Sequence, residues 1–330
     1  MLIGYVSDER YLALCDVALE FLNDSGSIEA RSRASGAVHA DLEPGEYTVC
    51  LQKPGFGQKR VTMTVTKGEP YHYRLLSEKL LGYMWPKWVQ SGEQSEFRCH
   101  STTPYKLELF RYGRDRELIK PIGWFDEHGP RAVTQITPDG DYTRTGVEWN
   151  KHGFISNVHA QMLTAPERSG LYYLHARNEG GEFFCFPWIV APAKPTARAA
   201  VLMCNITWNA YNNFGGRSNY IHADQMPPVP TVNARLELQR YTDSEHHAYA
   251  VTEYAPLSFD RPEPISHIDP DSAVDGPIEG RLASANAPVE WRLLSWLERE
   301  GIAHDVYGET QLHEDTLTLD DYDVLLTGAH

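Results

Sequence analysis

Short stretches of alternating apolar and polar residues fill roughly the first 190 positions, separated by turns rich in Gly, Pro and Asp. A period of two predicts half-buried β-strands. Such strands are predicted at 36–40, 47–51 and 60–65, and again at 96–100 and 105–112. We therefore expect this part of the chain to be built of β-sheets.

The clearest pair of strands is a predicted hairpin. Residues 170–177 and 182–190 are rich in aromatic residues, and the connecting Asn178-Glu179-Gly180-Gly181 has the composition of a tight turn. We expect the aromatic side chains to form core contacts and cross-strand pairs.

The pattern changes after the proline-containing stretch 191–196, which predicts a linker between domains. The following strand, 199–205, is apolar without alternation, as in a parallel strand that is covered on both faces. A second strand is predicted at 303–307, and a third, also buried, at 323–327.

A helix is predicted between the first two of these strands. Asn286 suits its N-cap, Pro288 its first turn and Gly301 its end. Helical spacing predicts one apolar face, made of Val289, Leu293, Trp296 and Leu297.

These patterns predict a multidomain chain. Two tandem all-β sandwiches of the Ig-like or transthyretin-like type, 1–78 and 79–193, precede an α/β, Rossmann-like domain at 194–330. In the first sandwich, 41–49 and 53–56 resemble the small transthyretin-like or carboxypeptidase-regulatory type. Because the last predicted strand has no covering helix after it, we expect the α/β domain to be incomplete and the natural chain to continue.

Charge and composition narrow the expected partners. The net charge is −15 and the Lys and Arg residues are scattered, which disfavours a nucleic-acid partner. Neither a membrane-spanning apolar run nor a secretory signal is evident, so we expect a cytoplasmic protein without a membrane partner. The five cysteines are far apart in the sequence and form no CxxC pair, which predicts buried free thiols.

The richest candidate chemistry is the stretch TWNAYNNFGGRSNY at 207–220, which follows the first parallel strand. Open α/β sheets bind ligands at the carboxyl ends of their strands. Tyr211 and Tyr220 flank Gly215-Gly216, whose flexibility would let both phenols reach one ion. Phenolate ligands imply a hard, highly charged metal such as ferric iron. The alternative is structural, with Tyr211 packed against the sheet and Tyr220 closing the loop.

Two further groups are expected at the same edge of a parallel sheet. Gly308-Glu309 follows the second strand and His330 follows the third. The alternative for His330 is a hydrogen-bonded structural histidine. A serine-hydrolase elbow, GxSxG, and the nucleotide motifs GxxxxGK and GxGxxG are absent from the sequence.

Four further parts of the chain complete a pattern with the stretch 207–220: Leu257-Ser258-Phe259-Asp260-Arg261-Pro262, the helix end 296–301, Leu312-His313 and the final 326–330. Together they resemble the large-subunit family of N,N-dimethylformamidase, from residue 191 onward. The resemblance implies a glutamine-amidotransferase-like α/β domain with a mononuclear iron held by two tyrosines and a glutamate, and a histidine close by.

Carried over by motif, the resemblance implies Tyr211 and Tyr220 as iron ligands, with Tyr254 as the reserve for the second. His330 would be the histidine, and the ligand glutamate would lie two residues beyond it, so the isolated 330-residue chain would bind metal poorly and be inactive. The implied activity is hydrolysis of a small amide, with iron polarising the carbonyl and His330 positioning water or moving a proton. The competing hypothesis is a non-catalytic scaffold. A homo-oligomer or a small-subunit partner is also expected.

Overall fold

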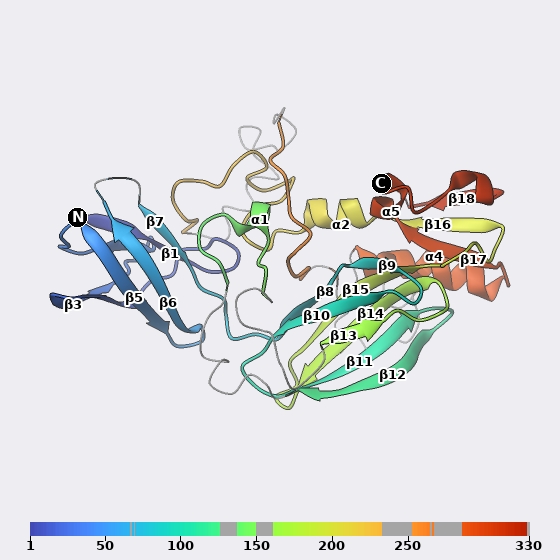
Figure 1. Cartoon of the computed structure of the whole chain (residues 1–330), viewed down its shortest axis with the longest axis horizontal. Coiled ribbons are helices and arrows are strands. Elements are labelled where there is room, and N and C mark those ends of the chain that lie inside the picture. Colours follow the sequence, from blue (N-terminus) through green and yellow to red (C-terminus); the bar gives the residue numbers. More distant parts are fainter. Residues whose placement is uncertain are drawn as a thin grey trace. The chain divides into compact units, whose positions relative to one another are not determined.

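The computed structural model describes residues 1–66, 68, 70–125, 137–149, 161–232, 253–264, 266 and 286–328. The described chain consists mostly of β-sandwich sheets with few helices (Figure 1). It divides into two compact units. Unit 1 comprises Met1–Lys79, His128–Gly153 and Asn213–Arg261, and unit 2 comprises Leu80–Glu127, Phe154–Asn212 and Pro262–His330.

Unit 1 contains a sandwich of two sheets. The three-stranded sheet has the order β4-β1-β7 and the four-stranded sheet has the order β3-β2-β5-β6. Their core-facing side chains pack into one buried cluster that includes Val6, Phe21, Val49 and Tyr73. The strands are β1 Leu2–Ser7, β2 Ala18–Asn23, β3 Gly26–Arg31, β4 Ala37–His39, β5 Gly45–Lys53, β6 Gly57–Val65 and β7 Tyr71–Arg74. The three strands predicted between 36 and 65 are confirmed. Unit 1 also contains the short helix α1 Tyr142–Thr145.

Unit 2 contains a second sandwich, with a three-stranded sheet β13-β10-β8 and a five-stranded sheet β12-β11-β14-β15-β9. The predicted hairpin is confirmed as β14 and β15, which pair antiparallel with Tyr173 opposite Pro187. The strands are β8 Leu81–Trp85, β9 Trp88–Gln90, β10 Gln94–His100, β11 Tyr105–Tyr112, β12 Arg116–Phe125, β13 Met162–Thr164, β14 Gly170–Asn178 and β15 Phe183–Ala191.

The five-stranded sheet is covered on both faces, as its strand β15 shows. On one face the indole Nε1 of Trp188 donates to Ser95 Oγ of β10 at 2.9 Å. On the other face Ile189 belongs to a buried cluster that includes Trp291 and Leu294 of the helix α4. Because both faces are buried, the sequence of β15 is apolar almost throughout instead of alternating.

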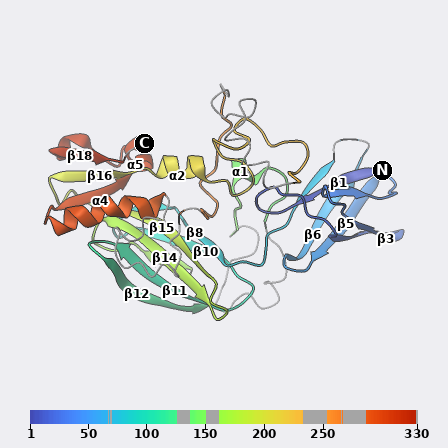
Figure 2. The same cartoon turned by 180° about the vertical axis from the view of Figure 1, so that it is seen from behind.

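The covering layer is a small parallel sheet with helices. Its order is β17-β16-β18, and both neighbours of the central strand β16 pair with it in parallel, as predicted. Figure 2 shows α4 between this sheet and the strands β14 and β15, with which it shares the buried cluster. The elements are β16 Ala199–Met203, α2 Asn205–Tyr211, α4 Ala287–Arg299, β17 His304–Gly308, α5 Glu309–His313, a 3₁₀ turn Leu319–Asp321 and β18 Val324–Thr327. The predicted division into three domains at 78 and 193 stays a prediction.

The predicted apolar face of α4 is wrong in part. The helix buries Trp291, Leu294 and Leu297, whereas Trp296 is 51% exposed. Trp291 sets this rotation because its indole Nε1 donates to Gly113 O at 2.6 Å while its ring packs at 5.2 Å from Tyr112. Asn286 holds the predicted N-cap position with φ +48°, but its side chain makes no capping bond.

Two burial predictions are also corrected. Strand β18 was expected to be buried, yet Val324 and Leu325 are 48% and 37% exposed, because within the described residues β18 is an edge strand that pairs only with β16. All five cysteines are free thiols, and Cys99, Cys185 and Cys204 are buried, but Cys15 is exposed and Cys50 is half-buried.

Candidate functional site

The carboxyl ends of β16 and β17 meet through direct hydrogen bonds. Asn205, the first residue of α2, donates from Nδ2 to Thr310 Oγ1 at 2.7 Å and accepts from the Thr310 N–H at 3.2 Å. The Ile206 N–H donates to Glu309 Oε2 at 3.1 Å. The predicted convergence of the groups that follow these two strands is therefore confirmed.

The third strand of the parallel sheet, β18, ends at the same edge as β16 and β17. A Cβ atom added to Gly328, directly after β18, would lie 2.3 Å from the Sγ of Cys204, the residue after β16. Only a glycine allows this close approach. The predicted catalytic residue His330 lies outside the described residues, so its role stays a prediction.

A buried carboxyl group anchors this edge, and the sequence analysis missed it. Glu290 of α4 accepts from the indole Nε1 of Trp208 at 2.6 Å and from the Cys204 N–H at 3.2 Å. The pKa of Glu290 is raised from 4.5 to about 7, mainly by burial and also by the negative charge of Glu309, although its hydrogen bonds to Trp208 and Cys204 act in the opposite direction. The sequence feature that could have revealed Glu290 is its position next to Trp291, inside the apolar stretch of α4.

Tyr211 is the last residue of α2 and its side chain is 36% exposed. The next residue, Asn212, is fully buried; its N–H donates to Trp208 O at 3.1 Å and its Nδ2 donates to Pro262 O at 2.8 Å. The latter bond ties the end of α2 to the Ser-Phe-Asp-Arg-Pro stretch, which is distant in sequence. This fixes the backbone on the C-terminal side of Tyr211.

A second buried carboxyl group follows Pro262. Glu263 is 3% exposed and its Oε1 pairs with the ammonium of Lys87, which is 6% exposed. Its other oxygen, Oε2, is buried and makes no hydrogen bond within the described residues. The Ser266 N–H donates to Glu263 O at 2.9 Å, and the buried Ser266 Oγ also makes no hydrogen bond there.

In unit 1, the glycine pair has the conformation that the sequence predicts. Gly215 and Gly216 have φ values of +101° and +98°, a region that side chains other than glycine rarely adopt. A Cβ at Gly215 would lie 2.3 Å from Thr143 Cγ2, and one at Gly216 would lie 2.3 Å from Tyr11 Cβ. The backbone of this loop therefore packs directly against its neighbours.

Three fully buried arginines hold this loop, namely Arg74, Arg217 and Arg261. Arg74 donates to Gly215 O at 2.9 Å, and Arg261 donates to Phe214 O at 2.6 Å. Arg217 donates from Nε to Asp141 Oδ2 and Thr143 Oγ1, both at 3.0 Å. The conformation of the loop is thus set by side chains from several parts of unit 1.

Tyr220 is half-buried, and its N–H donates to Ser218 Oγ at 3.0 Å. Tyr254, the reserve candidate, is 48% exposed. Tyr211 belongs to unit 2, whereas Tyr220 and Tyr254 belong to unit 1. The pairing of Tyr211 with either tyrosine on one ion stays a prediction.

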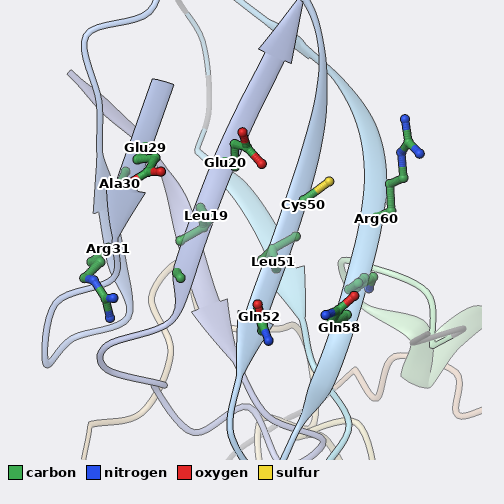
Figure 3. A pocket seen from close by; sticks show the side chains of 12 residues that line it. Leu19, Glu20, Glu29, Ala30, Arg31, Cys50, Leu51, Gln52, Gln58 and Arg60 are labelled. Carbon is green, nitrogen blue, oxygen red and sulfur yellow. The ribbon is translucent and has the colours of Figure 1, made fainter. Parts of the chain in front are cut away.

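A separate hollow of about 940 Å³ lies on the outer face of the four-stranded sheet of unit 1 (Figure 3). One row across it runs Glu29, Glu20, Cys50 and Arg60, which pair in register. The row joins two acidic side chains to a basic one on a solvent-facing surface. It is the weaker candidate for a site.

Within the described ranges, no group of three or more His, Cys, Asp or Glu side chains is arranged to hold a metal ion. None of the described helices is long and apolar enough to cross a membrane.

Comparison with known families identifies the C-terminal part of the chain. The family described as "N,N-dimethylformamidase beta subunit-like, C-terminal" matches residues 119–330. The chain belongs to this family. The match includes both α2 and the carboxyl edge of the parallel sheet. It confirms the family that the motifs of the sequence resemble.

Other comparisons add little. No curated protein matches the chain significantly. Among solved structures, a DUF3823 family protein from Bacteroides ovatus is 8% identical, with 56% of this chain and 98% of that chain covered and a TM-score of 0.20. The B. ovatus mixed-linkage glucan utilization locus protein SGBP-B, in complex with a heptasaccharide, is 10% identical, with 61% and 45% covered and a TM-score of 0.18. Likenesses this weak carry no conclusion about this chain.

Proposed function

We propose that this protein is a metal-dependent hydrolase that cleaves the C–N bond of a small amide. The observation that carries the proposal is the family match over residues 119–330, because the name of the family refers to an amidase and the matched part contains the carboxyl edge of the parallel sheet. We also propose that the parallel strands, together with α2, α4 and α5, form a glutamine-amidotransferase-like α/β layer.

The proposed oxygen donors are of the type that suits a ferric ion. Tyr211 and Tyr220 supply phenol oxygens, and the buried Glu263 Oε2 has no partner among the described residues. Oxygen donors that can carry negative charge suit a hard, highly charged ion. A bound ferric ion would polarise the amide carbonyl as a Lewis acid.

The roles proposed for the two tyrosines and His330 are those that the family resemblance implies. Tyr211 and Tyr220 would hold the ion through their phenol oxygens. Glu290 fixes the start of α2 through Cys204 and Trp208, and so determines where the helix carries Tyr211. His330 would take up a proton from the attacking water at a ring nitrogen.

The test is reconstitution of the chain with ferric iron, followed by visible spectroscopy and an assay of small amides. We expect a tyrosinate-to-iron absorption band, iron bound in a defined ratio and hydrolysis of a small amide. A protein that stays colourless and hydrolyses no small amide after iron loading would contradict the proposal, and would leave the non-catalytic scaffold as the better hypothesis.

A further inference from the structure

A hollow in unit 2 combines tryptophan rings with carboxyl groups. It has a volume of about 760 Å³ and lies where the link between β8 and β9 meets the end of α5. Its described lining includes Trp85, Trp88, Glu93 and Glu314, and contains no Lys, Arg or His. None of the residues proposed for the amide chemistry belongs to it, so the hollow requires a separate explanation.

The link that carries the two tryptophans is fixed from the inside of the unit. Between them, Lys87 is 6% exposed and its ammonium pairs with the carboxylate of the buried Glu263. The carbonyl of Lys87 accepts from the Ile189 N–H at 2.9 Å. Trp85 and Trp88, on either side of this anchor, are half-buried, and both line the hollow.

The ring of Trp88 is held next to a carboxylate. Its indole Nε1 donates to Glu314 Oε2 at 2.9 Å, so a negative charge lies at the edge of the ring. The helix α5, which ends at Glu314, is itself tied to β9 because Gln311 Nε2 donates to Val89 O at 3.1 Å. Trp88 also packs against the buried cluster that contains residues of α4. Ring and carboxylate are therefore positioned before any ligand arrives, which lowers the cost of binding.

A second carboxylate is positioned by the turn between β9 and β10. Glu93 Oε2 accepts from the Gln90 N–H at 2.7 Å, and the Glu93 carbonyl accepts from the Ala165 N–H at 2.7 Å. Glu93 and Glu314 are both exposed, so a ligand in the hollow can reach their oxygens. Among the described residues, neither of these two carboxylates pairs with a basic side chain.

The charges of the lining select the class of ligand. The face of a tryptophan ring attracts a cation, and so does a carboxylate, whereas an anion would be repelled by both carboxylates. Trp85 already shows this attraction within the protein, because the guanidinium carbon of Arg98 lies 5.4 Å from the centroid of its ring. Alkyl groups on an ammonium nitrogen reduce its hydration, so an alkylated ammonium loses less on leaving water than a bare one.

We propose that this hollow binds an organic cation through an alkylated ammonium group, which packs on the ring of Trp88 and is attracted by Glu314 and Glu93. Trp85 forms the other aromatic part of the wall. The volume lies in the range of small-molecule sites, so the hollow also accommodates the remainder of a ligand larger than the ammonium group. The site shares no residue with the proposed amide chemistry, and the two proposals are tested independently.

The experiment compares two probes of the same shape and different charge. These are choline and 3,3-dimethylbutan-1-ol, in which a carbon atom replaces the ammonium nitrogen. Binding to the protein is measured by titration calorimetry and by the change in tryptophan fluorescence. Choline should bind at least about tenfold more tightly than the uncharged alcohol, because only the cation is attracted by the rings and the carboxylates. Its binding should also weaken as the salt concentration rises.

The first variant tests the ring. Trp88→Leu should weaken choline binding at least about tenfold, because Leu keeps an apolar side chain but removes the aromatic face. Trp296→Leu is the matched control, since Trp296 is 51% exposed elsewhere in unit 2, and it should bind choline like the parent. Where Trp88→Leu does not fold, by circular dichroism, Trp88→Phe is measured instead. Its smaller ring attracts a cation less strongly, so the preference for choline over the alcohol should fall.

The second variant tests the charge. Glu314→Gln can still accept the hydrogen bond from Trp88 Nε1 but has no negative charge. It should weaken choline binding roughly two- to fivefold, as expected for an exposed charge pair, and leave binding of the alcohol unchanged. Glu300→Gln removes an exposed charge that does not line the hollow, and it should leave the binding of both probes unchanged.

Four results would overturn the proposal. The first is a parent protein that does not bind choline, and the second is one that binds the alcohol equally well. The third is choline binding that is the same in Trp88→Leu and Glu314→Gln as in the parent, which would place the cation elsewhere. The fourth is binding of a neutral oligosaccharide, with cellohexaose as the probe, in place of choline, which would assign the aromatic lining to sugar rings.

Discussion

Replacing Glu290 by Gln should change how the stability of the protein depends on pH. Burial raises the pKa of Glu290 from 4.5 to about 7. A carboxyl group whose pKa is higher in the folded than in the unfolded state stabilises the fold fully below its unfolded pKa and loses this contribution as the pH rises through the folded pKa. The parent protein should therefore lose stability between these two values, and the neutral Gln variant should not.

The size of the effect follows from the two pKa values. Each unit of difference corresponds to about 1.4 kcal/mol, so the full effect is roughly 3 kcal/mol, of which about 2.5 kcal/mol falls between about pH 5 and pH 8. The amide of Gln can still accept the hydrogen bond from Trp208 Nε1, so the variant keeps the main anchor of α2.

The assay is urea unfolding of the parent chain and of Glu290→Gln at both pH values. Glu298→Gln, on the same helix, is the matched control. Burial would raise the pKa of Glu298, but the hydrogen bonds and positive charge of Arg111 outweigh it and lower this pKa. The contribution of Glu298 is lost only as the pH falls below the usual carboxyl range, so the Glu298→Gln difference should stay flat across this window. A Glu290→Gln difference that is equally flat would refute the reasoning.

Two further predictions concern packing. In urea unfolding, Gly216→Ala should destabilise unit 1 by roughly 1–3 kcal/mol more than Gly55→Ala. Both residues have positive φ, but only at Gly216 would the new Cβ contact a neighbouring atom, at 2.3 Å. Equal losses of stability in the two variants would contradict the steric argument. Leu297→Ala should cost about 2–5 kcal/mol and Trp296→Ala much less, since Leu297 is 1% exposed and Trp296 is 51% exposed; a larger loss at Trp296, measured by the same method, would show that the face of α4 is assigned wrongly.

Local patterns in the sequence predicted ten of the eighteen described strands and the parallel pairing of the C-terminal sheet. Alternation predicted β5 and β6, and the unbroken apolar stretch 199–205 predicted a parallel strand covered on both faces, which is β16. That the residues after β16 and after β17 lie together was predicted from topology, because the carboxyl ends of parallel strands lie at one edge; the structure shows the contact between Asn205 and Thr310. The glycine pair 215–216 was also evident, since only glycine readily adopts positive φ in so tight a loop.

The sequence by itself thus determined many of the strands, the helix α4, the parallel layer and the stretch that contains Tyr211 and Tyr220. The tertiary structure decided which face of α4 is buried, because Trp291 is fixed by Gly113, a residue 178 positions away. It also decided which carboxyl groups are buried and what they bind. Glu290 accepts a hydrogen bond from Trp208, and Glu263 pairs with Lys87, 176 positions away, while its Oε2 makes no hydrogen bond within the described residues. Periodicity reports only a residue's near neighbours along the chain, whereas burial and unsatisfied hydrogen bonds depend on side chains that folding brings from distant positions.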